Sequence, residues 1–257
     1  MGKTPCWHQK MRLARSLHKV IVFSSLLEFF MKLVSQKTLL VCLLAVVPFV
    51  ASAQLSSNIA LTSNYKFRGQ DQDASKSADF KPALQGGFDY AFSNGFYVGN
   101  WNSNVNWLVG NSLEVDVYGG YKRELSPGLT YDVGILAYAY PGASAANTTE
   151  VYGGLSYGPL SAKYSQTVSS QYFGGSKASY FNVGYATELT AGLTLKASVG
   201  MTDFKVGTDY SDYSLGLSYD LGEGFSLGGA YVGATKKSSF TPGINDNRYV
   251  LSLSKAM

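Results

Sequence analysis

Residues 113–141 read LEVDVYGGYKR, then ELSPG, then LTYDVGILAYAYP, and this stretch decides the fold class. In both halves the odd-numbered residues are mostly apolar, whereas the even-numbered ones include Glu114, Asp116, Lys122 and Asp132. A period of two indicates two β-strands, each with one apolar face. The sequence SPG supplies the reversal between them. Each strand is long enough to cross a membrane at a tilt, and the charged face is typical of a barrel with a water-filled lumen.

The same alternation continues along the chain after residue 53. We expect twelve alternating segments, at 57–68, 79–92, 96–107, 113–123, 129–141, 149–157, 160–166, 180–189, 193–202, 212–221, 225–234 and 248–255. The connections between them alternate in length, as do the periplasmic turns and external loops of outer-membrane barrels. The sequence therefore predicts an all-β fold, a transmembrane antiparallel β-barrel of about twelve strands with both termini in the periplasm.

A soluble β-sandwich would also alternate, but it would need protected edge strands and an apolar face turned inward. The apolar faces here carry charge only near strand ends, as at Arg123 and Lys255. Tyr and Phe residues also gather near strand ends, where a barrel places its aromatic girdles. These features favour the barrel, as does the signal-peptide pattern at residues 31–53 that is described next.

The chain divides into three parts. Residues 31–53 hold two lysines, an apolar run of about a dozen residues and a terminal Ala-Ser-Ala, which is the pattern of a cleaved secretory signal peptide. Residues 1–30 precede this signal and are interpreted as an extension from a mis-assigned start codon, with Met31 the true start; an unusually long leader is the alternative. Residues 54–257 then form the barrel, which we expect in the outer membrane.

Removing residues 1–53 changes the charge of the protein. Of the 21 Lys and Arg residues, seven lie there, and of the 17 Asp and Glu residues only one does, so the net charge falls from +4 to −2. The basic charge is thus no argument for nucleic-acid binding. All Cys and His residues also lie before residue 54: Cys6, His8, His18 and Cys42. We expect no disulfide, no Cys or His metal site, no cofactor and no catalytic His.

The polar faces of the predicted strands supply the candidate pore-lining residues. They are Lys66, Arg68, Lys81, Asn100, Asn102, Asn104, Glu114, Asp116, Asp132, Glu150, Lys163, Lys196 and Arg248. The asparagines recur at every second position and thus share one face, which we place in the lumen as a neutral row. That row either binds polar solutes or only lines the wall.

The charged candidates separate into two groups. Strand direction places Lys66, Arg68, Lys81 and Arg248 on one wall near the outer mouth, facing Glu114, Asp116 and Glu150. Two opposed walls would create a transverse field that orients dipolar solutes and sets ion preference. Alternatively, the two groups pair directly and brace or plug the barrel. The nearby aspartates Asp71, Asp73 and Asp79 are interpreted as a solvated acidic loop, with a bridging divalent cation as the alternative.

Several strings resemble the TorF-type porin family of Gram-negative outer-membrane proteins. They are SSNIALTSNYKFRGQDQ, ALQGGFDYAFSNGFYVGNW, EVDVYGGYKREL, GLTYDVGILAYAYPG and TEVYGGLSYGPLSAKYSQT, and the resemblance covers residues 55–255. It implies an outer-membrane β-barrel with a porin function and no residue-level site. One departure is Met257, which stands where such barrels commonly end on an aromatic residue.

Three classes of function fit the sequence to different degrees. The leading hypothesis is a passive, narrow channel for small polar or ionic solutes, because twelve strands lie between filled eight-stranded barrels and wide porins. The alternative is a structural or surface-receptor barrel with a plugged lumen and no transport. An enzyme is not expected, since residues 54–257 lack a His base and no motif replaces one. The expected partners are outer-membrane lipid and lipopolysaccharide, small polar solutes and the barrel-assembly machinery, and not nucleic acid.

Overall fold

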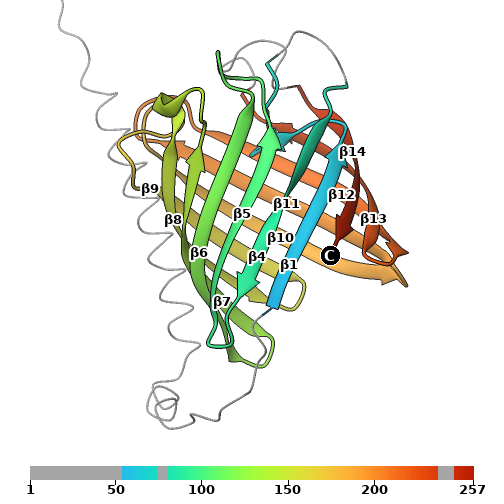
Figure 1. The fold of residues 1–257 in the computed structure, drawn as a ribbon. Coiled ribbons are helices and arrows are strands. Elements are labelled where there is room, and N and C mark those ends of the chain that lie inside the picture. Colours follow the sequence, from blue (N-terminus) through green and yellow to red (C-terminus); the bar gives the residue numbers. More distant parts are fainter. Residues whose placement is uncertain (1–53, 75–79, 237–245) are drawn as a thin grey trace, which may run out of the picture. The chain divides into compact units, whose positions relative to one another are not determined.

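The computed structural model describes residues 54–74, 80–236 and 246–257, so the predicted leader and Asp79 lie outside the described residues. Twelve strands close into a barrel in which every neighbour is antiparallel (Figure 1). They are β1 Gln54–Thr62, β4 Ala83–Ala91, β5 Phe96–Asn104, β6 Leu113–Ser126, β7 Leu129–Ala139, β8 Thr148–Tyr157, β9 Leu160–Thr167, β10 Ala178–Thr190, β11 Leu193–Phe204, β12 Tyr210–Gly222, β13 Phe225–Ala234 and β14 Arg248–Ala256. The predicted antiparallel barrel of about twelve strands is confirmed, and the periplasmic location of its termini stays a prediction.

Closure is made by β1, which pairs with both β4 and β14. Leu61 lies opposite Leu84 on one side and opposite Leu253 on the other. The wall therefore has no free edge, and its backbone groups are bonded from strand to strand as a membrane requires. None of the helices in the described ranges has the length and hydropathy needed to span a bilayer.

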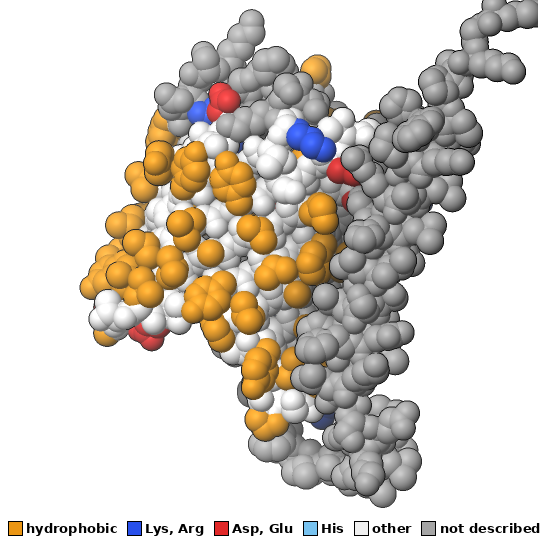
Figure 2. Space-filling view, turned by 180° about the vertical axis from the view of Figure 1, so that it is seen from behind, with side chains coloured by type: hydrophobic (Ala, Val, Ile, Leu, Met, Phe, Trp, Pro, Cys, Tyr) orange, Lys and Arg blue, Asp and Glu red, His pale blue; other side chains and the backbone are white. Residues whose placement is uncertain are grey.

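The two faces of the wall differ as the alternation predicts. On the outer face large apolar side chains stay exposed, for example Val117 at 56% and Leu215 at 57%. Seen from behind, hydrophobic side chains cover the middle of the wall, and charged ones lie near its ends (Figure 2). On the inner face Glu114 and Glu150 are each 1% exposed. This inversion of the usual burial pattern indicates a barrel surrounded by lipid.

The two ends of the barrel differ in their connections. The short-turn rim holds the turns at 92–95, 127–128, 158–159, 191–192 and 223–224. Gly128 and Gly192 have φ of 80° and 77°, which favour glycine, and their amides donate to the side chains of Glu124 and Glu188. The long-loop rim holds the connections 63–82, 105–112, 140–147, 168–177, 205–209 and 235–247, the first and last of which are described in part.

The first predicted strand is too long. It was expected over 57–68, but β1 ends at Thr62 and the chain then leaves the wall. Two short strands, β2 Lys66–Phe67 and β3 Gln70–Asp71, pair as a separate hairpin. Arg68 at φ 48° and Gly69 at φ 76° make the reversal between them. The next wall strand begins only at Ala83, because Pro82 has no N–H to donate to a ladder.

The faces of the third predicted segment are reversed. Asn100 lies opposite Phe88, which is 58% exposed on the outer face, and opposite Val117 on the other side. Paired residues in an antiparallel ladder point to the same side of the sheet. Asn100, Asn102 and Asn104 therefore lie on the outer face, and the prediction that they line the lumen is wrong. Their neighbours Tyr97 and Trp101 point inward instead.

Candidate channel and its constriction

Residues 65–72, here called the lumen hairpin, cross the barrel inside the long-loop rim. Their side chains reach wall strands all around the circumference. Tyr65 Oη donates to Glu114 Oε1 of β6 at 3.0 Å, and Gln70 Nε2 donates to Tyr210 Oη of β12 at 2.7 Å. Since β6 and β12 lie far apart in the strand order, one short segment spans the lumen.

Arg68 fixes the tip of the lumen hairpin to β8. Its two terminal nitrogens donate to Glu150 Oε1 and Oε2 at 2.9 and 2.7 Å, a bidentate pair in which the side chains are 7% and 1% exposed. The guanidinium also donates to Tyr172 Oη at 3.1 Å and lies 4.1 Å from the centre of the Tyr180 ring. A desolvated arginine with this many partners holds its segment in one position.

Gly69 brings the backbone of the lumen hairpin against the far wall. A Cβ at this position would lie 2.8 Å from the Cβ of Asp212 and 2.8 Å from the carbonyl oxygen of Gly233. Both its positive φ and this close approach exclude a larger residue. The tip therefore touches the β12–β13 side while Arg68 holds the β8 side.

A second ion cluster fixes the base of the lumen hairpin. Asp71 accepts from Arg248 Nε of β14 at 2.9 Å and lies 3.2 Å from Lys66 Nζ. Burial lowers the pKa of Lys66 from its ordinary value, and the charge of Asp71 opposes that shift. Nearby, Lys81 Nζ donates to the carbonyl oxygen of Asp73 at 2.9 Å. The interpretation of Asp71 as part of a solvated loop is wrong, because this residue is 4% exposed.

Aromatic side chains pack around the lumen hairpin. The ring of Phe67 lies 5.6 Å from that of Tyr138 and 5.7 Å from that of Phe173, with edge-to-face geometry at both contacts. Trp107 and Tyr140 extend this cluster. Such pairs add stabilisation beyond the apolar area that they bury. Phe67 thus lies in a packed cluster within the rim, and it does not face lipid as the strand prediction implied.

Glu114, Asp116 and Glu150, the predicted acidic group near the outer mouth, do converge at the long-loop rim. Glu114 accepts hydrogen bonds from Tyr65 and Tyr140, and Glu150 accepts from Arg68 and Tyr138. Asp116 is 7% exposed, and its Oδ1 has no hydrogen-bond partner within the described part of the chain. No group of three or more His, Cys, Asp or Glu in the described ranges has the geometry to hold a metal ion.

The lumen contains an open space toward the short-turn rim. A cavity of about 640 Å³ there is lined by Asp89, Tyr97, Tyr118, Lys122, Asp132, Tyr152 and Lys163, among others. The tyrosines are tied to carboxylates, since Tyr97 donates to Asp132 at 2.6 Å and Tyr118 to Asp89 at 2.5 Å. Lys163 Nζ lies 3.7 Å from the centre of the Tyr152 ring. This half of the lumen presents charged and hydroxyl groups to a cavity of small-molecule size.

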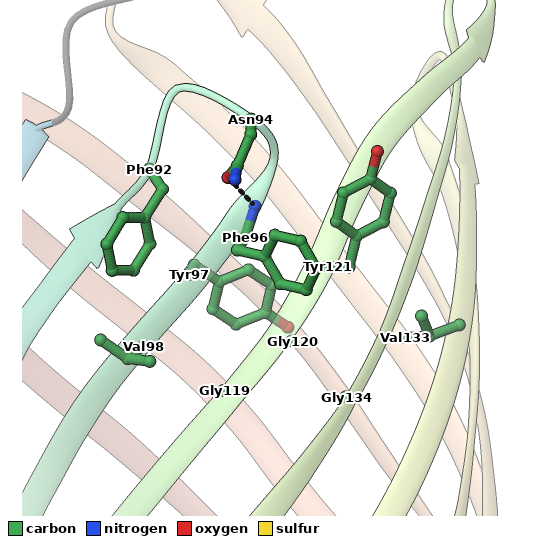
Figure 3. A pocket seen from close by; sticks show the side chains of 10 residues that line it. All are labelled: Phe92, Asn94, Phe96, Tyr97, Val98, Gly119, Gly120, Tyr121, Val133 and Gly134. Carbon is green, nitrogen blue, oxygen red and sulfur yellow. Dashed lines mark hydrogen bonds between the residues drawn. The ribbon is translucent and has the colours of Figure 1, made fainter.

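Glycines make room for these tyrosines. A separate hollow of about 680 Å³ at the same rim is lined partly by outward side chains such as Val98 and Val133. Figure 3 shows that Tyr97 lies across Gly120 there, with Gly134 on the next strand. A Cβ at Gly120 would lie 2.5 Å from Tyr97 Oη, and one at Gly134 would lie 2.5 Å from Tyr152 Oη. The two tyrosine hydroxyls are hydrogen-bonded to each other. The paired glycines thus allow two large side chains to meet inside the wall.

The opposite wall is lined differently. Its inward positions carry small side chains, among them Gly184, Ser198, Gly200, Ser214, Gly216, Ser218, Gly228, Ala230, Ser252 and Ser254. Lys196 is the predicted site residue on this wall, and it lies opposite Gly216 of β12. The lumen is therefore asymmetric, with bulky side chains on β5–β8 and mostly small ones along β10–β14.

Ten of the thirteen predicted pore-lining residues project into the lumen or its mouth, and three lie on the outer face. Sequence reasoning missed Tyr65, Phe67, Tyr97, Tyr152 and Phe173. The available signal was the Phe-Arg-Gly-Gln-Asp string at 67–71, in which a glycine follows an arginine where a strand would end. The two charged walls are not simply opposed, because Arg68 pairs with Glu150 and Arg248 pairs with Asp71.

A closed, antiparallel, twelve-stranded barrel with an apolar outer face and a charged lumen defines the class of porin-like barrels. Solved structures agree with this fold. The "KdgM porin" aligns with a TM-score of 0.53 and 12% identity, covering 78% of this chain and 98% of that one. The "NanC porin" aligns with a TM-score of 0.52 and 10% identity, covering 79% and 98%. No curated protein sequence shows significant similarity to the chain.

The chain belongs to the family described as "Bacterial protein of unknown function (Gcw_chp)", whose model matches residues 50–256. The porin-like part of the sequence resemblance agrees with the fold of the solved structures. The TorF-type assignment itself stays a prediction.

Proposed function

We propose that this protein is a porin-like channel of the bacterial outer membrane, through which small polar or ionic solutes diffuse passively. The observation that carries the proposal is the lumen itself. A cavity lined by charged and hydroxyl groups lies toward the short-turn rim, and the lumen hairpin narrows the other end. The exposed apolar wall supports a location in the membrane, with lipid and lipopolysaccharide around it and the barrel-assembly machinery needed for its insertion.

The size of the barrel favours small solutes. Barrels of eight strands are filled by side chains, and those of sixteen leave a wide aqueous channel, so twelve strands fit a narrow path. The structural neighbours include one titled "KdgM porin in complex with disordered oligogalacturonate", with a TM-score of 0.50 and 12% identity. The charges that line this lumen are of both signs, which favours polar, zwitterionic or mixed-charge solutes over a single ionic class.

A plugged structural barrel is the second candidate, and the lumen hairpin is the observation that favours it. Its side chains are bonded to β6, β8, β12 and β14. In that case the hairpin acts as a permanent seal and the wall and loops carry the function. The two candidates therefore differ in whether the lumen hairpin narrows the lumen or closes it.

Single-channel recording in a planar bilayer separates the two candidates. The full chain is compared with a variant in which residues 65–72 are replaced by a short Gly-Ser linker. A channel gives small steps for the native protein and larger steps for the variant, because removing the constriction widens the path. Steps for the variant alone identify the hairpin as a seal. The absence of steps for both proteins, each verified as a heat-resistant barrel, overturns the channel proposal.

A further inference from the structure

The outer face of β5 carries a row of amides, whereas most outer positions of the wall are apolar. Asn100 lies between Phe88 and Val117, Asn102 lies between Gly86 and Val115, and Asn104 lies opposite Leu113. Corresponding outer positions on the other side of the barrel are filled by residues such as Leu215 and Leu217, which are 57% and 46% exposed. Gln166 of β9, opposite Val151, is another outward amide, but its oxygen and nitrogen are both hydrogen-bonded within the barrel. The β5 face differs in carrying three amides at successive outer positions.

Two of these amides lie at the depth of the lipid tails. Phe96, at the start of β5, marks the aromatic girdle of the short-turn rim together with Tyr121, its partner in the ladder. A tilted strand climbs about 2.6 Å per residue along the membrane normal. Asn100 and Asn102 therefore lie about 10 and 16 Å from that girdle, within an apolar band of about 25 Å.

The asparagines are only half satisfied by their own barrel. Asn100 Oδ1 accepts from the amide of Phe88 at 3.3 Å, and Asn102 Nδ2 donates to the carbonyl oxygen of Gly86 at 3.3 Å. These backbone partners fix which amide atom is oxygen and which is nitrogen. Within the described residues, Asn100 Nδ2 and Asn102 Oδ1 have no hydrogen-bond partner. Lipid tails cannot supply one, and an unsatisfied polar group in hydrocarbon is costly.

The two remaining groups are self-complementary. Asn100 offers a donor and Asn102 offers an acceptor, two residues away on the same face. In a two-fold contact between identical surfaces, the donor of one copy faces the acceptor of the other, and the reverse holds at the same time. Asn104 is already bonded at both amide atoms, to the amide of Leu84 and the carbonyl oxygen of Pro82. The open donor and acceptor are therefore confined to Asn100 and Asn102.

The surface around this pair also allows a close approach. The outer position beside Asn102 is Gly86, so no side chain stands between Ile59 and Asn102 across β4. Small residues at membrane interfaces let two backbones come near enough for polar side chains to bond. Apolar side chains of Phe88, Val115 and Val117 surround the patch and would exclude lipid from it.

We propose that this β5 face is the contact surface for a second copy of the same chain, which gives a two-fold dimer within the membrane. Asn100 Nδ2 of each copy donates to Asn102 Oδ1 of the other, and the Gly86 depression receives the partner's β5 strand. The proposal rests on the membrane location given above and does not depend on transport.

Cysteine cross-linking in native membranes tests the contact. In a background without Cys6 and Cys42, two differently tagged copies are produced together, one with N100C and the other with N102C, because the proposed contact sets residue 100 of one copy against residue 102 of the other. The control carries L217C on both tagged copies, which places the thiols at an outer, mid-wall position on β12. Mild oxidation should give a disulfide-linked species of twice the barrel mass that carries both tags, and it should leave L217C monomeric. Equal cross-linking of the L217C copies, or no linked species with both tags, overturns the proposal. An N102C adduct of another mass identifies a different partner and also overturns it.

A second variant tests the hydrogen bonds without threatening the fold. The double substitution N100L and N102L places apolar side chains against lipid, so the barrel should stay heat-resistant. Native mass spectrometry in a mild detergent should show the dimer association constant falling about ten-fold, since each membrane hydrogen bond is worth about three-fold. Conductance per barrel should not change, because the patch lies outside the lumen. An unchanged dimer refutes the pairing, and altered conductance would place the patch in the lumen and also overturn it.

Discussion

Replacing Arg68 by Gln tests whether its ion pair holds the lumen hairpin closed. R68Q removes both charge-assisted bonds to Glu150, at 2.9 and 2.7 Å, and leaves a carboxylate that is 1% exposed with Tyr138 at 3.3 Å as its remaining described partner. Removing one partner of a buried pair costs about 3–5 kcal/mol. The wall strands do not need this pair for their ladder. We therefore expect the loss to appear as local opening of the hairpin.

The expected size of the effect follows from that cost. About 3–5 kcal/mol corresponds to a factor of roughly 10² to 10³ or more in the opening equilibrium. Gln72 is 8% exposed, so a Cys at this position in a cysteine-free background reports on opening. Its rate of reaction with a membrane-impermeant maleimide should rise by about that factor in R68Q when opening is fast relative to labelling. Channel conductance should rise in the same variant if the hairpin is the constriction.

A double-mutant cycle supplies the control. E150Q alone leaves the guanidinium buried without its counter-charge and should also speed labelling, whereas R68Q with E150Q should lie closer to the native rate than either single change. K196Q removes a lumen charge far along the wall from the hairpin and should change nothing. An unchanged rate in R68Q, or strictly additive effects of the two single changes, would refute the idea that this pair holds the hairpin.

Three further predictions concern the wall and its orientation. A Cys in 168–177 should be labelled by an impermeant reagent on intact cells and one in 127–128 should not, because long loops face outward in such barrels; the opposite pattern would invert the topology. G120V should destabilise the barrel by about 1–3 kcal/mol, measured as a lower unfolding temperature, because its Cβ would lie 2.5 Å from Tyr97 Oη; wild-type stability would contradict the packing described. N104L should leave solute permeation unchanged, since this residue lies on the outer face; a changed permeation rate in liposome swelling would place it in the lumen.

The strands illustrate where local pattern is enough. In β6 the inward Glu114 and Asp116 and the outward Val117 obey a simple rule. A charged side chain is costly against lipid, whereas an apolar one is not. The rule applies to each residue separately, so it can be used without knowing which strands pair. It therefore predicted the strand number, the antiparallel order and the alternation of short and long connections.

The face of β5 illustrates where local pattern fails. Either set of alternate residues could face outward, because Phe96 and Val98 alternate with Tyr97 and Trp101. Asparagine is also a residue type that a water-filled lumen favours, which led to the wrong choice of face. The choice between faces depends on register with the two neighbouring strands, and a shift by one residue would turn every side chain to the other side. Tyr97 is drawn inward by Asp132 and Tyr152, which come from strands β7 and β8.

By itself, the sequence determined that this chain is a lipid-facing β-barrel, since a two-residue period with one apolar face needs no distant partner. The tertiary structure alone decided where the first strand ends. Through residues 63–68 the alternation continues as it would in a strand, yet Arg68 and Asp71 find their partners 82 and 177 residues away, at Glu150 and Arg248. Contacts between residues so far apart in the sequence leave no local pattern. The lumen hairpin could therefore be recognised only in the tertiary structure.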